Sequence, residues 1–163
     1  MTATRPSIWL TASGAGRYAD GVKRLELARL RVCGRCGKGA AELGSPDGDR
    51  VVVPLDAVRA RQLSGGDPSE DLRSLTDFVL ERLGPRRIGE IVLDVEDGRL
   101  RALLSLLGEG DRARPEILAC TAEEGVALAI RGGLRLYATD EALAHAAARS
   151  SRAPRHGGPD TVH

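Results

Sequence analysis

The chain has 163 residues, which is the size of one domain with a substantial hydrophobic core. Hydrophobic residues make up 42% and charged residues 29%, as is ordinary for a globular protein, but aromatic residues make up only 2%. So few aromatic side chains argue against a stacking platform for single-stranded nucleic acid. The formal net charge of +1 also lacks the basic excess of a dedicated duplex-binding protein, although local arginine clusters could contact phosphates.

Cysteine usage and hydropathy indicate a reduced, cytoplasmic protein. Three cysteines are too few for a disulfide framework in a chain of this length. The first residues lack the apolar core of a signal peptide, and no apolar stretch is long enough to span a bilayer. We therefore expect no membrane partner.

Composition divides the chain into a lead-in, one domain and a tail. Residues 1–21 mix Ser, Thr, Ala and Gly without a sustained hydrophobic period. Residues 149–163 combine Pro, Gly and Ser and show no apolar face. We expect both ends to be poorly ordered and the globular domain to span residues 22–148.

The first half of the domain is expected to form strands and then helices. Alternating or β-branched apolar residues predict strands at residues 25–32, 40–43 and 51–53. A short helix, capped by Asp56, is expected to end near Leu63. The run Asp67-Pro68-Ser69-Glu70 is typical of a second helix start, and Gly84-Pro85 is typical of its end.

The second half contains a hairpin and a helix with signals at both ends. Residues 88–95 and 100–107 are expected to pair around the turn dipeptide Asp97-Gly98. After a strand that ends at Cys120, Thr121 and Glu124 have the spacing of a capping box, and Gly132-Gly133 ends the helix. A short strand and a last helix complete the domain, at residues 134–137 and 139–148.

Residues 120–148 resemble the C-terminal signature of the bifunctional nuclease family, I-A-L-A-L-R-x-G-x-P-I-Y-V. The residues in register are Val126-Ala127-Leu128-Ala129-Ile130-Arg131, Gly133 and Leu136-Tyr137-Ala138. The hairpin resembles the family segment V-x-I-x-D-L-x-D-G-T-F-x-A-x-L through Val92, Asp94, Asp97, Gly98, Ala102 and Leu104. The resemblance covers roughly residues 22–148.

This resemblance implies an α+β fold with a mainly antiparallel, curved sheet of about six strands and three or four packed helices. It implies self-association as a homodimer or larger assembly. It also implies metal-assisted hydrolysis of DNA and RNA, which needs carboxylates that converge on a divalent ion such as Mg²⁺ or Mn²⁺. The candidate catalytic carboxylates are Glu123 and Glu124 at the signature helix and Asp94 and Asp97 at the hairpin.

Several polar positions of the family differ in this chain. The family's R-P-S-D is Thr121-Ala122-Glu123-Glu124 here, Arg59 stands where the family has a glutamate, and the family's His-Asp pair has no counterpart in register. Local structure also explains Glu124 as a cap and Asp97 as a turn residue. The alternative function is therefore a catalytically silent family member that acts as an oligomeric interaction or regulatory module.

The segment Cys33-Gly34-Arg35-Cys36 could supply two thiolates to zinc, because its glycines let backbone N–H groups approach the sulfurs. Zinc needs four ligands, or three and a water, and a second C-x-x-C or H-x-x-H is missing. Cys120 and His145 are the other soft ligands of the domain. A zinc ion shared between subunits, a redox dithiol and an inert glycine-rich loop are the alternatives.

Overall fold

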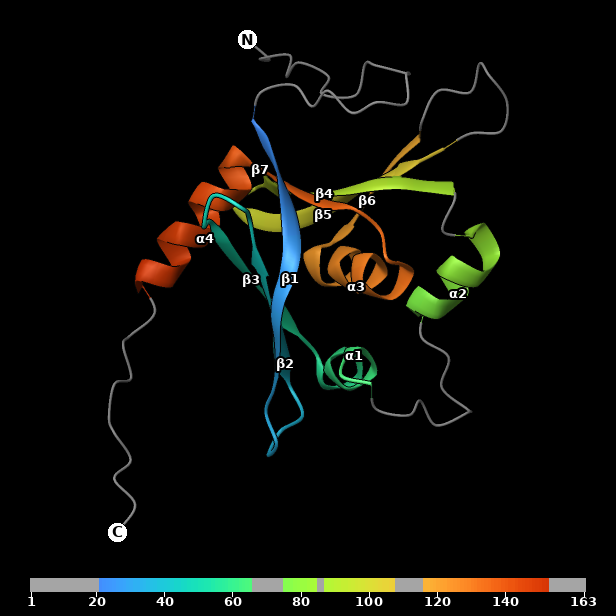
Figure 1. The fold of residues 1–163 in the computed structure, drawn as a ribbon, viewed down its shortest axis with the longest axis horizontal. Coiled ribbons are helices and arrows are strands. Elements are labelled where there is room, and N and C mark those ends of the chain that lie inside the picture. The colour runs from blue at the N-terminus through green and yellow to red at the C-terminus, as the bar shows by residue number, and fades with distance from the viewer. Residues whose placement is uncertain (1–20, 66–74, 85–86, 108–115, 153–163) are drawn as a thin grey trace.

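A computed structural model describes residues 21–65, 75–84, 87–107 and 116–152 (Figure 1). Within these residues the chain forms seven strands and four helices. The strands are β1 (Val22–Val32), β2 (Gly39–Gly44), β3 (Arg50–Leu55), β4 (Ile88–Glu96), β5 (Arg99–Leu106), β6 (Glu116–Thr121) and β7 (Leu136–Thr139). The helices are α1 (Ala57–Leu63), α2 (Leu75–Leu83), α3 (Ala122–Gly132) and α4 (Asp140–Arg152).

All seven strands belong to one curved sheet, in the order β3-β2-β1-β7-β4-β5-β6. Neighbouring strands are antiparallel except β7 and β4, which are parallel. The predicted α+β class is thereby confirmed, but the sheet is mixed and has seven strands. The parallel pair arises because α3 connects β6, at one end of the sheet, to β7 in its centre.

Two helices, α3 and α4, pack against the central strands and share one hydrophobic core with them. Ile91, Val92 and Leu93 are buried in succession on β4, and every residue of β7 is buried, which requires cover on both faces. α4 packs against β3, β4 and β7, whereas α3 packs against β3, β4, β5 and β6. Figure 1 shows α3 and α4 on opposite sides of β1. None of the helices in the described residues is long and apolar enough to cross a membrane.

A glycine allows α3 to lie very close to the sheet. A Cβ atom at Gly125 would collide with the Cβ atom of Ala102 on β5 and would also crowd Ile91 on β4. The backbone of α3 is therefore in direct contact with the sheet at this point. This close contact fixes the position of the helix start, where two of the candidate carboxylates lie.

The local signals of the second half are confirmed. Thr121 and Glu124 form a capping box, and Gly133 follows α3 in the left-handed conformation, with φ 59°. Asp97 and Gly98 have φ values of 51° and 69°, as a two-residue hairpin turn of this kind requires.

α4 continues to Arg152, past the expected domain end at residue 148, because its alanine-rich sequence favours helix. The predicted helix start at Asp67-Pro68-Ser69-Glu70 lies outside the described residues.

Candidate functional site

The start of α3 holds Glu124 in a defined position. The N–H group of Glu124 donates to Thr121 Oγ1 at 3.2 Å. In return, Glu124 Oε2 accepts from the Thr121 N–H group at 3.1 Å and from the Thr121 hydroxyl at 2.9 Å. The carboxylate is thus part of the helix cap, as its spacing predicted.

Arg59 of α1 lies against the same helix start and is the main electrostatic partner of its acids. Its Nη1 atom is 3.2 Å from Glu123 Oε2, and its Nη2 atom is 3.5 Å from Glu124 Oε1. Nη1 is also 3.7 Å from Asp56 Oδ2, and the N–H group of Asp56 donates to Glu123 Oε1 at 2.5 Å. The side chain of Arg59 is only 21% exposed, so a permanent cation lies among three carboxylates.

The other two candidate carboxylates come from the β4–β5 hairpin. Asp94 is on β4 and accepts from the Thr139 hydroxyl at 2.9 Å, and Thr139 Oγ1 in turn accepts from the N–H group of Ala142 in α4. Asp97 is in the β4–β5 turn. The structure therefore separates Asp94 from the start of α3.

A divalent ion such as Mg²⁺ needs several oxygen ligands around one point. Within residues 21–65, 75–84, 87–107 and 116–152, no group of three or more His, Cys, Asp or Glu side chains is arranged to hold an ion. Two of the four candidates, Glu123 and Glu124, are also engaged by Arg59. The described carboxylates of a single chain therefore do not fit a catalytic metal ion.

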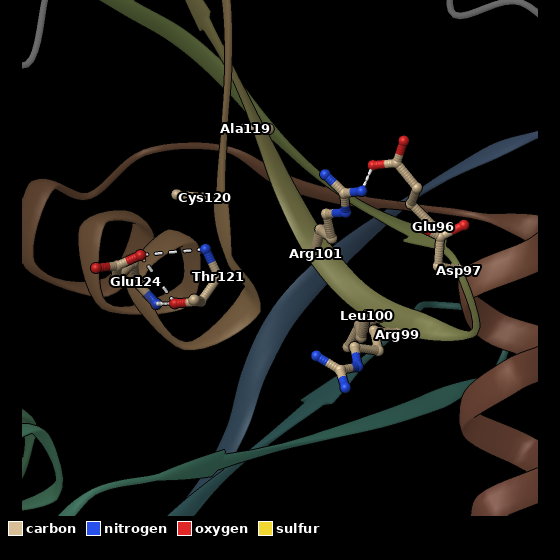
Figure 2. A pocket seen from close by; sticks show the side chains of 9 residues that line it. All are labelled: Glu96, Asp97, Arg99, Leu100, Arg101, Ala119, Cys120, Thr121 and Glu124. Carbon is tan, nitrogen blue, oxygen red and sulfur yellow. Dashed lines mark hydrogen bonds and ion pairs between the residues drawn. The ribbon is translucent and has the colours of Figure 1, made fainter.

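An open pocket of about 690 Å³ lies between the β4–β5 hairpin and the start of α3 (Figure 2). Its lining is Glu96, Asp97, Arg99, Leu100, Arg101, Ala119, Cys120, Thr121 and Glu124. The pocket brings together two of the candidates, Asp97 and Glu124. Figure 2 shows Glu124 with Thr121 on one side and Arg101, paired with Glu96, on the other.

The arginines of this pocket, Arg99 and Arg101, were not among the predicted site residues. Both precede an apolar residue on β5, so strand alternation places them on one face. The alternation of arginines with apolar residues was the sequence signal that could have identified Arg99 and Arg101. It could not show that α3 would bring Glu124 to the same pocket, because β5 and α3 meet only in the folded chain.

Cys120 also lines the pocket, on β6. Burial raises the pKa of its thiol to about 11, and the nearby Glu124 carboxylate adds to this effect, whereas Arg59 opposes it. The thiol is therefore protonated at neutral pH and is a poor nucleophile. Cys120 contributes a neutral side chain to the pocket.

Cys33 and Cys36 lie together in the exposed turn between β1 and β2. The N–H group of Cys36 donates to Cys33 Sγ at 3.4 Å. This backbone N–H group, followed by the Cys36 thiol and the N–H group of Arg35, lowers the pKa of Cys33. Among the described residues neither Cys120 nor His145 joins them in a group that could hold a metal ion.

A scan against models of known protein families gives no match to this chain, and a search of curated proteins gives none either.

Proposed function

We propose that the chain is a catalytically silent relative of the bifunctional nuclease domains that acts as an interaction module. It associates with a second copy of itself through the outer edge of β6. The observation that carries this proposal is the exposed, apolar edge of that strand.

β6 is an end strand of the sheet. It pairs with β5 along its whole length, and its other edge pairs with no strand in the described part of the chain. Five of its six residues are exposed, including Ile117 at 36% and Leu118 at 45%. The strand contains no lysine or proline, the residues that commonly prevent an edge from pairing. Such an edge is suited to accept another strand.

The sequence of β6 is self-complementary. Two copies can pair antiparallel about a two-fold axis that passes through the centre of the pair at Leu118. Leu118 then lies opposite the partner's Leu118, and Ile117 opposite the partner's Ala119. Glu116 lies opposite the partner's Cys120, so the two glutamates stay at opposite ends of the pair. Apolar side chains therefore meet apolar side chains without opposed like charges.

Arg59 supports the absence of nuclease chemistry. It stands at a position where the resemblance implies a glutamate, and its guanidinium contacts Asp56, Glu123 and Glu124. A metal ion at the start of α3 would have to displace this permanently charged group. Two of the four carboxylates implied as catalytic, Glu123 and Glu124, already have a counterion within the chain.

Metal-assisted cleavage of nucleic acid is the second candidate function. One observation favours it: Asp97 and Glu124 line the same open pocket as Arg99 and Arg101. Guanidinium groups of this kind bind phosphate oxygens. In this alternative the two acids would have to hold Mg²⁺ or Mn²⁺ with ligands from the substrate or water.

Self-association is tested by sedimentation velocity of the full chain in the presence of a chelator and a reductant. We expect a dimer that the Leu118→Lys substitution converts to monomer, because a buried lysine at the centre of the strand pair loses its hydration. Val58→Lys on α1 is the matched control, since Val58 is also exposed and apolar. A monomeric native chain, or a dimer unchanged by Leu118→Lys, would contradict the proposed interface.

The nuclease alternative is tested with single-stranded and double-stranded DNA and RNA, in Mg²⁺ or Mn²⁺. The Glu124→Gln variant is the sharpest comparison, because glutamine keeps an oxygen that can accept the cap hydrogen bonds. We expect no cleavage by either protein. Cleavage that chelator and Glu124→Gln both abolish would replace the silent-module proposal with the nuclease.

A further inference from the structure

The turn between β1 and β2 presents two cysteine sulfurs to solvent. Cys33, Gly34, Arg35 and Cys36 are all exposed, and Figure 1 shows the turn extending past α1. Two backbone hydrogen bonds close the turn, from Cys33 N–H to the Lys38 carbonyl at 2.7 Å and from Gly37 N–H to the Cys33 carbonyl at 2.8 Å. The turn is therefore a defined structure that holds the two thiols in fixed positions.

We propose that Cys33 and Cys36 form half of a zinc site, which the same two cysteines of a second copy complete. The site would contain four thiolates, two from each hairpin tip, around one tetrahedral ion. This inference concerns a different surface from the β6 edge and does not depend on it.

The backbone of the turn suits a metal-bound thiolate pair. The N–H group of Cys36 already points at Cys33 Sγ. Hydrogen bonds from N–H groups stabilise the charge on metal-bound sulfur and orient the ligand. Gly37 follows with φ +72°, a left-handed conformation that lets the chain reverse directly after the second cysteine. The C-x-x-C spacing is the one found in structural zinc sites.

The remaining ligands have to come from outside the described part of the chain. Within that part, no third His, Cys, Asp or Glu side chain forms a metal-binding group with the two thiols. A second copy offers an identical pair of thiols on an equally exposed tip. Two such tips can meet about a two-fold axis that passes through the ion. The result is the closed four-sulfur set that structural zinc prefers.

The charges around the turn also favour a second copy of the chain as the partner once zinc is bound. A zinc ion with four thiolates carries a net charge of about −2. Arg35 and Lys38 lie in and beside the turn, and both are exposed, so two copies would place four cations around this anionic centre. Without the ion, two basic tips would repel each other. Association at this surface should therefore require the metal.

The experiment uses the full-length Leu118→Lys chain, reduced and freed of metal, so that the β6 contact does not contribute. Titration with Zn²⁺ should double the sedimenting mass and end at one zinc for every two chains. Titration with Co²⁺ should give the sulfur-to-metal charge-transfer absorption of a tetrahedral four-thiolate site. Cys33→Ser and Cys36→Ser should each abolish both responses, whereas Cys120→Ser is the matched control and should keep them.

Three results would overturn the zinc proposal. These are one tightly bound zinc per chain with the mass of a monomer, no zinc bound by the reduced chain, and zinc-dependent dimers that persist in Cys33→Ser. Circular dichroism of each variant shows that the chain is folded when the metal response is lost. If the native chain dimerises in chelator but binds no zinc, the zinc proposal fails while the β6 interface stands. If the native chain is monomeric in chelator but the reduced chain binds one zinc for every two chains, the β6 interface fails while the zinc proposal stands.

Discussion

At the scale of single residues, Arg59 decides what the acids at the start of α3 can do. It joins two helices that are far apart in sequence, because its guanidinium contacts Glu123 and Glu124 from α1. These ion pairs are partly buried, so water screens them less than a fully exposed pair. Arg59 therefore acts as a structural link between α1 and α3.

We expect Arg59→Gln to lower the free energy of unfolding by about 1 kcal/mol, because it leaves two partly buried carboxylates next to each other without a cation. Urea denaturation followed by circular dichroism measures the change. Arg61→Gln is the matched control, since Arg61 is exposed in the last turn of the same helix. Equal effects of the two substitutions would show that the ion pairs contribute nothing measurable.

The three cysteines should differ in reactivity as a function of pH. The pKa of Cys33 is lowered, chiefly by the N–H group of Cys36, whereas burial raises the pKa of Cys120 to about 11. In metal-free buffer near neutral pH, iodoacetamide should therefore modify Cys33 well before Cys120, as measured by peptide mass spectrometry. The difference between the two modification rates should disappear in urea. Faster modification of Cys120 than of Cys33 in the folded chain would contradict the lowered pKa of Cys33 and the raised pKa of Cys120.

The same shift at Cys120 has a consequence for stability. A thiol with a raised pKa keeps its proton in the folded chain, while in the unfolded chain it ionises near its ordinary value of 9.0. The unfolded state therefore loses protons first as the pH rises. The contribution of Cys120 to stability is fully present below about pH 9 and decreases between pH 9 and about 11.

At the scale of elements, the contact between α3 and the sheet leaves no room for a larger residue at Gly125. We expect Gly125→Ala to cost about 1–3 kcal/mol, because the new methyl group would push α3 away from Ala102 and Ile91. Gly34→Ala is the control, since a Cβ atom there meets nothing within 4 Å. The comparison uses urea denaturation, and a stable Gly125→Ala variant would mean that α3 can shift on the sheet at little cost.

The elements could be predicted from sequence wherever their signals are local. The capping box at Thr121 and Glu124, the end of α3 at Gly133 and the Asp97-Gly98 turn each depend on residues within a few positions of one another. The insertion of β7 between β1 and β4 could not be predicted in this way, because strand pairing joins segments that are far apart in the chain.

The candidate site, too, could be predicted only where its contacts are local in the sequence. Sequence reasoning correctly treated Glu124 as part of a cap, but it could not place Arg59 beside Glu123, since that contact depends on how α1 packs near α3. The predicted site also put Asp94 and Asp97 together at the hairpin. Asp94 instead bonds to Thr139, while Asp97 lines the pocket.

At the scale of the whole molecule, the two proposed contacts lie on different surfaces and would act together. Each is a two-fold contact, and a chain with two different two-fold contacts builds rings or filaments instead of stopping at a dimer. We expect zinc to shift the native chain to species larger than a dimer, whereas Leu118→Lys and Cys33→Ser should each stop at a dimer. Light scattering after size-exclusion chromatography measures this, and a zinc-bound native dimer would show that the two contacts exclude each other.

The central position of β7 also affects how the chain folds. Val22 of β1 pairs with Thr139 of β7, so the two halves of the sheet are joined by the strand that comes last in chain order among the described strands. Until β7 leaves the ribosome, β1 and β4 each have an edge with no partner strand. Long-range pairing of this kind gives a high contact order and slow folding. A nascent chain released before β7 would therefore expose two unpaired strand edges at once and would be prone to aggregation.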